Sequence, residues 1–221
     1  MSTTQNRKKI FSVIKQLVFM FGIAFVFLCL VMYFIQDSLI YHPSDADFFA
    51  CPYFTEEQKQ TVNETRFYEV RRSDTVAILY HGNAGSACDR IYWDGIFAEA
   101  GISTIIVEYS GYGGDGKKPS QKSILAGVEI MADYASTYTT SVLVGESIGS
   151  GPASYHASLT NPSLLILLAP FDSLANNARM HYPYLPVRLL LKGDYDNVRW
   201  LADRTATTVL IHGDKDVIVY P

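Results

Sequence analysis

The chain has 221 residues, of which 48% are hydrophobic and 18% are charged, a composition that suits one sizeable globular domain. Its net charge is −4 at pH 7, and four of its 18 basic residues lie within the first 15 positions, which leaves 14 basic against 22 acidic residues in the rest. This acidic balance excludes nucleic acid as an expected partner.

The N-terminal segment predicts a membrane anchor. Residues 1–16 form a basic tail, and residues 17–35 carry no charged or strongly polar side chain. As a helix this run spans about 28 Å, which matches the hydrocarbon core of a bilayer. A cleaved signal peptide is the alternative, but its apolar core would be shorter and a small-residue cleavage site would follow. We therefore expect a single-pass signal-anchor.

The charges on either side of this run predict its orientation. Arg7, Lys8, Lys9 and Lys15 precede it without an acid, and Asp37 follows it. Because cations stay on the cytoplasmic side, the N-terminus is expected in the cytoplasm. The rest of the chain would then lie on the lumenal, periplasmic or extracellular side.

Residues 36–62 mix aromatic, proline and charged residues without periodicity, and we expect a linker packed loosely between membrane and domain. Cys51 lies in this linker and Cys88 lies beyond it. In an oxidising compartment the two could pair, and two unpaired thiols are the alternative, because spacing does not show proximity. Asn63 begins a glycosylation sequon, which would be used only in a eukaryotic lumen.

Residues 63–221 predict one α/β domain in which buried strands alternate with helices. Runs rich in Val, Ile and Leu between helical segments are typical of a mostly parallel sheet covered on both faces. The expected strands are 65–71, 75–80, 102–109, 141–144, 163–169 and 208–211, and the expected helices are 88–100 and 121–135.

A G-x-S-x-G pentapeptide, Gly145-Glu146-Ser147-Ile148-Gly149, follows the strand at 141–144 and precedes small, helix-compatible residues. This pattern predicts a nucleophile elbow, a sharp strand-to-helix turn that presents the Ser147 hydroxyl. The flanking glycines fit, because a strained turn leaves no room for a Cβ atom. The pentapeptide alone is a weak signal, and its strength comes from the loops that accompany it.

Two other strand ends complete the predicted site. The strand at 75–80 runs into a small-residue loop that contains Asn83, and the strand at 208–211 is followed by Asp216. The backbone N–H groups of Asn83 and Ile148 are expected to form an oxyanion hole. An acid placed like Asp216 can orient a catalytic histidine.

These motifs together resemble the membrane-anchored abhydrolases of the α/β-hydrolase superfamily. The matching segments begin at Ser38-Leu39-Ile40-Tyr41-His42-Pro43 and continue with His81-Gly82-Asn83-Ala84-Gly85, Gly111-Tyr112-Gly113, the elbow, Ala169-Pro170-Phe171-Asp172-Ser173-Leu174 and His212-Gly213-Asp214-Lys215-Asp216. The resemblance implies Ser147 as nucleophile and Asp216 as the acid, with Asp214 as second choice. Ser110 stands where the family usually has an arginine, which puts a loop-bracing salt bridge in doubt.

The general base does not follow from the sequence. In this superfamily the histidine comes after the acid, and no histidine follows Asp216. His81 and His212 are expected to brace strand-end loops, and His156 to lie too far along the elbow helix to reach Ser147. The remaining histidines are His42 and His181. We therefore expect a chain that ends before the catalytic histidine, with the last strand and helix missing.

Residues 175–200 are aromatic, punctuated by proline and interposed between two core strands, where hydrolases insert a lid. Tyr182 and Tyr184 would then form an apolar wall for an acyl group, and the alternative is a structural cap on the sheet. A glycine-rich run at 111–118 departs from the P-loop pattern at Lys118 and Pro119, so nucleotide binding is not expected.

The sequence therefore predicts a membrane-anchored serine hydrolase that cleaves a lipid-like acyl ester or thioester, with no metal or organic cofactor. One alternative is a membrane-anchored binding protein, or an inactive fragment, on the same scaffold. A serine peptidase is the second alternative. Fold alone does not determine the substrate.

Overall fold

The structure, a computed structural model, describes residues 2–219 and contains a seven-stranded sheet in the order β2-β3-β6-β4-β7-β8-β9. β2 and β3 pair antiparallel at one edge, and the five strands from β6 to β9 are parallel. The strands are β2 (Lys59–Val62), β3 (Thr65–Val70), β4 (Thr75–Tyr80), β6 (Ser103–Glu108), β7 (Thr140–Glu146), β8 (Leu164–Leu168) and β9 (Thr207–Ile211). The predicted, mostly parallel sheet is confirmed.

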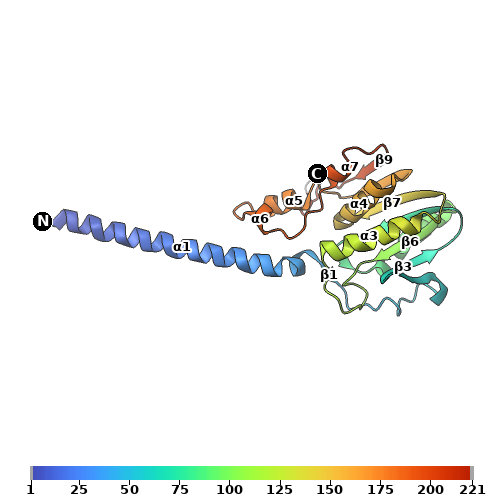
Figure 1. The fold of residues 1–221 in the computed structure, drawn as a ribbon, viewed down its shortest axis with the longest axis horizontal. Helices are drawn as coiled ribbons and strands as arrows, with labels where there is room; N and C mark the ends of the chain where they lie inside the picture. Colours follow the sequence, from blue (N-terminus) through green and yellow to red (C-terminus); the bar gives the residue numbers. More distant parts are fainter. Residues whose placement is uncertain (1, 220–221) are drawn as a thin grey trace.

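Helices cover both faces of this sheet, as predicted (Figure 1). α3 (Gln121–Ala135) and α4 (Ser150–Thr160) pack on the face that carries Ile78 and Tyr80 of β4. α2 (Ile91–Glu99) packs on the opposite face, where Ala77 and Leu79 point. Side chains alternate across a strand, so β4 contributes to both cores and is buried along nearly its whole length. A central strand of this kind gives a rigid platform to the loop that follows it.

α1 (Ser2–Ile40) projects from the domain as a single long helix (Figure 1). Its 39 residues span about 58 Å, so it is longer than the predicted run at 17–35 in both directions. The stretch from Lys9 to Ile40 is long and apolar enough to cross a membrane, and its surface is exposed. A signal sequence near an N-terminus can meet the same criterion of length and hydropathy.

The expectation of a loosely packed linker is wrong for most of its length. Phe48 and Phe54 stack on opposite sides of the Tyr68 ring, with centroids 4.4 and 4.2 Å away, and all three side chains are buried. Cys51 forms a disulfide with Cys88, which settles the alternative left open by the sequence. Each aromatic side chain inserts singly into the domain, so its burial leaves no periodic pattern in the sequence.

Two further pieces hold this N-terminal arm. β1 (His42–Pro43) pairs in parallel with β5 (Ala84–Gly85), directly after β4. The 3-10 helix η1 (Glu56–Gln58) leads into β2, and η2 (Ala87–Arg90) leads into α2. The arm therefore runs along the domain from the end of α1 to the sheet edge.

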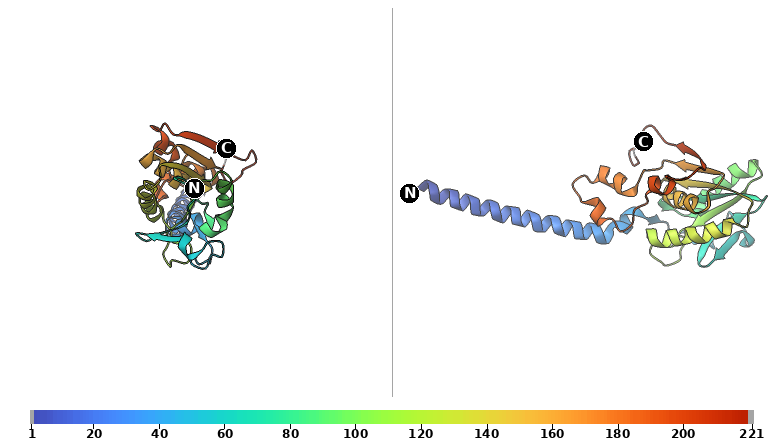
Figure 2. Two further views of the ribbon diagram at one scale, coloured as in Figure 1. Left: turned by 90° about the vertical axis from the view of Figure 1, so that its right-hand side faces the viewer. Right: turned by 45° about the horizontal axis from the view of Figure 1, so that its top comes forward.

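The segment between β8 and β9 divides into two parts. α5 (Leu174–His181) and α6 (Val187–Leu190) lie beside the domain end of α1, as Figure 1 and the right-hand view of Figure 2 show. α7 (Asn197–Leu201) packs against α4, and the buried Tyr195 just before it lies against Gly151. The second part therefore belongs to the core.

β9 is the outermost strand of the described sheet, and its residues are exposed. Val209, Leu210 and Ile211 present apolar side chains there. An exposed apolar edge strand has unpaired backbone groups and favours association with another strand.

Candidate active site

Ser147 occupies the turn between β7 and α4, at the start of the 3-10 helix η3 (Ser147–Gly149). Its φ is 51°, in the left-handed region that residues with a Cβ atom rarely adopt. Strain of this kind persists only where the surrounding structure enforces it, and it clusters at functional sites. The side chain is half-buried, and within residues 2–219 no group hydrogen-bonds to its hydroxyl. This is the geometry of a nucleophile elbow.

The two glycines of the pentapeptide permit this turn. A Cβ atom on Gly149 would overlap the carbonyl oxygens of Tyr80 and His81, and one on Gly145 would lie 2.6 Å from the Gly149 carbonyl oxygen. Real Cβ atoms do not approach backbone oxygens so closely. The glycines therefore let α4 start directly against the end of β4, which brings the Ile148 backbone beside the loop after β4.

We expect Gly149→Ala to destabilise the domain by about 1–3 kcal/mol, because the added methyl group has only backbone to push against. The matched control is Gly95→Ala in α2, where a Cβ atom meets no other atom within 4 Å. That change should stabilise the helix by about 0.5–1 kcal/mol. Urea unfolding of the two full-length variants measures both effects, and equal stability would contradict this account of the turn.

The predicted oxyanion loop is fixed by the segment that follows α1. The Asn83 carbonyl accepts a hydrogen bond from the His42 backbone N–H at 2.9 Å and one from the Tyr112 hydroxyl at 2.7 Å. The Asn83 side chain donates to the Ile40 carbonyl at 3.3 Å. β4 and β7 are adjacent and parallel, with Tyr80 paired to Gly145. Asn83 and Ile148 therefore follow neighbouring strand ends at one edge of the sheet, as the oxyanion-hole prediction requires.

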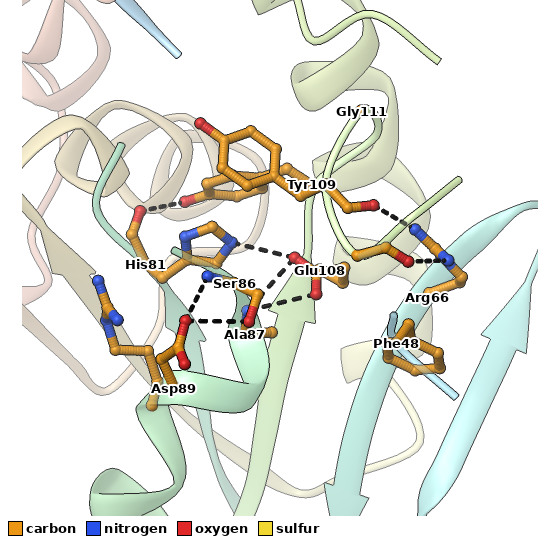
Figure 3. A network of polar contacts seen from close by, with 12 residues as sticks. Phe48, Arg66, His81, Ser86, Ala87, Asp89, Glu108, Tyr109 and Gly111 are labelled. Atoms are coloured by element: carbon orange, nitrogen blue, oxygen red, sulfur yellow. Dashed lines mark hydrogen bonds and ion pairs between the residues drawn. The ribbon is translucent and has the colours of Figure 1, made fainter. Parts of the chain in front are cut away.

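A buried carboxylate lies beneath this loop (Figure 3). Glu108, at the end of β6, accepts hydrogen bonds from the Ala87 backbone N–H at 3.3 Å, and its Oε1 lies 3.4 Å from His81 Nε2. Both side chains are fully buried. His81 Nδ1 lies 2.7 Å from the Gly82 carbonyl oxygen, and the ring stacks on Tyr109. These contacts fit the loop-bracing role expected for His81.

Arg66 supplies a brace that the sequence reading did not identify (Figure 3). It donates hydrogen bonds to the carbonyls of Tyr112 at 2.5 Å and Gly113 at 2.9 Å, and lies 3.8 Å from Asp115. The loop after β6 is therefore held by an arginine from the neighbouring strand, whereas the resemblance implied an arginine at the position of Ser110. Only the register of β3 against β6, which pairs Arg66 with Glu108, reveals this contact.

Glu146, directly before Ser147, ties this turn to α2. Its carboxylate accepts hydrogen bonds from Arg90 Nε at 2.8 Å, from Trp93 Nε1 at 2.6 Å and from the Tyr92 hydroxyl. Burial alone would raise the pKa of Glu146, but these hydrogen bonds outweigh it and lower that pKa. The sequence reading missed this role. A glutamate at the end of an otherwise buried apolar strand was the available signal.

Asp216, the predicted acid, lies in the turn after β9. Its Oδ1 accepts hydrogen bonds from the backbone N–H groups of Ile218 at 2.9 Å and Val219 at 3.0 Å, which lower its pKa. Its Oδ2 lies 3.6 Å from His212 Nε2. β9 and β7 flank β8 in the parallel sheet, so the turn of Asp216 and the elbow lie at the same edge. Asp214 is exposed in the same turn.

Four of the five histidines in residues 2–219 have ring contacts with groups other than Ser147, and His42 is exposed in β1. His156 is buried in α4 with Nδ1 2.7 Å from the Tyr80 hydroxyl, and burial lowers its pKa to about 4, so it is neutral at pH 7. His212 Nε2 lies 2.8 Å from the Val219 carbonyl oxygen, and His181 Nε2 lies 2.7 Å from that of Ile218. Residues 2–219 also contain no group of three or more His, Cys, Asp or Glu side chains that could hold a metal ion.

The structure places the two predicted pocket tyrosines against α1 and on the surface. Tyr182 lines an apolar cavity of about 130 Å³, shared with Met32, Leu39 and Leu185. Tyr184 is 89% exposed. Within the described residues, no hydrogen bond joins the hydroxyl of either tyrosine to Ser147. The acyl-binding wall stays a prediction.

Sequence comparison identifies relatives, although no family model matches the chain. An uncharacterised protein of Mycobacterium tuberculosis is 31% identical over 152 residues, which are 66% of this chain and 54% of the relative. The alpha/beta hydrolase domain-containing protein 17C of Xenopus tropicalis is 26% identical over 150 residues, covering 64% and 46%. The chain thus spans about half the length of these relatives.

Solved structures share its architecture. Est1E from Butyrivibrio proteoclasticus, solved with ferulic acid bound, superposes with a TM-score of 0.58 at 17% identity and covers 73% of this chain and 80% of its own. An esterase of Pyrococcus furiosus gives a TM-score of 0.54 at 17% identity, covering 82% and 79%. At these sequence identities the likeness shows the fold alone, and the chemistry has to be argued from the residues of the site.

Proposed function

Because this chain has the α/β-hydrolase fold and homologues among the α/β-hydrolase domain-containing proteins, we propose that it is a serine hydrolase of carboxylic esters or thioesters. The homology and the esterase-like fold support a hydrolase function. The observation that carries the serine mechanism is Ser147 itself, held at a positive φ with an unbonded hydroxyl beside the loop after β4.

In this proposal the Ser147 Oγ attacks the acyl carbonyl carbon while a general base takes the hydroxyl proton. The backbone N–H groups of Ile148 and Asn83 stabilise the oxyanion that forms on the carbonyl oxygen. The alcohol or thiol then leaves with that proton, which gives an acyl-enzyme, and water releases the acid by the same route. Each backbone donor of this kind contributes on the order of 10²–10³ in rate.

Asp216 is the proposed partner of the base. Two backbone N–H groups fix its Oδ1. Its Oδ2 lies on the side of the His212 ring nitrogen Nε2. A carboxylate held in this way can orient a histidine and stabilise its charged form. The base itself is proposed to be a histidine, as in other members of the superfamily.

We propose further that α1 is a single-pass anchor with its N-terminus in the cytoplasm. The cations before the apolar run and Asp37 after it support this orientation. The disulfide between Cys51 and Cys88 supports it independently, because disulfides persist outside the cytosol. Anchoring beside a bilayer favours a lipid-like acyl substrate.

A second candidate is a membrane-anchored binding protein on the same scaffold. It is favoured by one observation, that none of the histidines of the described region hydrogen-bonds to Ser147. Such a protein would hold an acyl group in the site without cleaving it.

Intact-mass spectrometry after mixing with p-nitrophenyl esters separates the two candidates. The hydrolase should release p-nitrophenol and gain the mass of one acyl group, which peptide mapping should place on Ser147. We expect esters of octanoate and longer acids to react faster than the acetate. Binding of the ester without any acyl adduct or product would support the binding protein.

A further inference from the structure

The α5–α6 protrusion, residues 174–192, has a composition unlike the rest of the domain surface. It contains no aspartate or glutamate, in a chain that has 22. Large apolar side chains stand out from it, with Tyr184 89% and Leu189 84% exposed, and Met180 and Tyr182 are also exposed. Soluble surfaces rarely carry such a patch unless something covers it.

Three polar contacts fix the height of the protrusion along α1. Gln36 donates a hydrogen bond to the Leu190 carbonyl at 2.9 Å and accepts one from the Lys192 backbone N–H at 2.8 Å. Lys192 Nζ lies 2.8 Å from Asp37 Oδ2 and 5.3 Å from the centre of the Tyr33 ring. Lysine and tyrosine are the residues that mark a membrane–water interface. The end of α6 is therefore pinned where the apolar run of α1 stops.

From this point the protrusion extends toward the predicted membrane span. The Leu190 side chain contributes to an apolar hollow together with Val26, Cys29 and Tyr33 of α1. At 1.5 Å per residue, Cys29 lies about 10 Å from Gln36 along the helix, inside the apolar run at 17–35. Figure 1 shows α6 alongside α1, between the sheet and the N-terminus of the chain. A bilayer that surrounds this run also reaches Leu190.

We propose that the α5–α6 protrusion inserts into the leaflet from which α1 emerges, as a second contact between the domain and the bilayer. The proposal rests on the membrane anchoring proposed above. It places most of the predicted lid in contact with lipid. The lack of carboxylates keeps the cost of insertion low. Its Arg and Lys side chains, Arg179, Arg188 and Lys192, have stems long enough to keep their charges at the interface.

Lipid fits this surface better than a protein partner does, because the apolar surface is continuous with that of α1. The cavity of about 130 Å³ between the two is lined by Met32, Leu39, Leu185 and Val187, with Gln36 as its polar member. Whatever solvates α1 along 25–33 also meets the protrusion. For a membrane-spanning helix that solvent is acyl chain.

Fluorescence quenching in vesicles tests the insertion with the full-length chain. In a Cys29→Ala background, Leu189→Cys is labelled with an environment-sensitive fluorophore under non-reducing conditions and reconstituted into phosphatidylcholine vesicles. Acyl-chain doxyl lipid should quench this probe, and aqueous iodide should not. The matched control is Ile96→Cys in α2, which is 53% exposed on the far side of the domain and should show the reverse.

A probe on the native Cys29 reports α1 separately. Doxyl quenching at Cys29 with iodide quenching at Leu189 would overturn the insertion and leave the anchor standing. Iodide quenching at both positions would overturn both. Ester hydrolysis by the unlabelled chain without substitutions, reconstituted in the same vesicles, reports the proposed function independently. Absence of hydrolysis there with doxyl quenching at Leu189 would refute the hydrolase and keep the insertion.

Discussion

In a protein that includes its catalytic histidine, Ser147→Ala is expected to abolish labelling by a fluorophosphonate and to lower ester turnover by on the order of 10⁴–10⁶-fold. The reason is that nucleophile, base and acid act as a unit, so that removing the nucleophile leaves only the oxyanion hole and substrate binding. Gel-based labelling and initial rates of p-nitrophenyl octanoate hydrolysis measure the two effects.

Ser163→Ala is the matched control. Its hydroxyl is exposed and donates to the Ser141 carbonyl at 2.8 Å, before the start of β8 and so at the opposite edge of the sheet. Labelling and turnover should be unchanged. Labelling that survives in Ser147→Ala would identify a different nucleophile and remove the basis of the proposed mechanism.

The same labelling assay tests whether His212 is the general base. His212 Nε2 is engaged by the Val219 carbonyl oxygen, so His212→Ala should disturb its loop and lower labelling less than Ser147→Ala does. A loss as large as that of Ser147→Ala, in a variant whose unfolding midpoint is unchanged, would make His212 the base. Asp216, 3.6 Å away, would then orient His212 itself.

The parts of the fold that were predictable have local causes. β4 begins at Thr75 and ends at Tyr80 as predicted, because a strand buried on both faces is a continuous apolar run between turn residues. α3 keeps its predicted bounds, because Ile124, Val128 and Met131 recur at helical spacing toward one core. The elbow was equally local, since its two glycines and serine are consecutive in the chain.

The parts that were missed depend on pairing between distant segments. Arg66 braces the loop after β6 only because β3 adds antiparallel to β6 in one register. His81 and Glu108 come together where the ends of β4 and β6 meet. The sequence alone does not show whether either side chain is buried. Register is not visible in a single sequence, so these contacts follow only from the structure.

The segment at 175–200 shows a third limit. Its aromatic and proline-rich composition predicted one unit, a lid or a cap. In the structure Tyr195 is fully buried beside α4, whereas Tyr184 lies on the surface of the protrusion. Composition shows that Tyr184 and Tyr195 are both aromatic, but whether each ring is buried depends on the path of the backbone.

The disulfide between Cys51 and Cys88 should account for a large share of the domain's stability. The two residues are 37 positions apart, and closing a loop of that size lowers the entropy of the unfolded chain by an amount equivalent to about 4 kcal/mol. The bond joins the N-terminal arm to η2, directly after the predicted oxyanion loop. We expect Cys51→Ser with Cys88→Ser to lower the free energy of unfolding by about 2–5 kcal/mol, measured by urea unfolding of the full chain in detergent.

Cys29→Ala, in the exposed apolar part of α1, is the matched control and should leave that free energy unchanged. The same cysteine pair also tests the orientation of the anchor. When intact cells are lysed in denaturant in the presence of a thiol-reactive polymer, Cys51 and Cys88 should stay unmodified unless a reductant is added, because an oxidising compartment keeps them paired. If both are modified without reductant, the domain faces the cytoplasm. The cations before residue 17 would then lie on the wrong side of the membrane, and the proposed topology would have to be reversed.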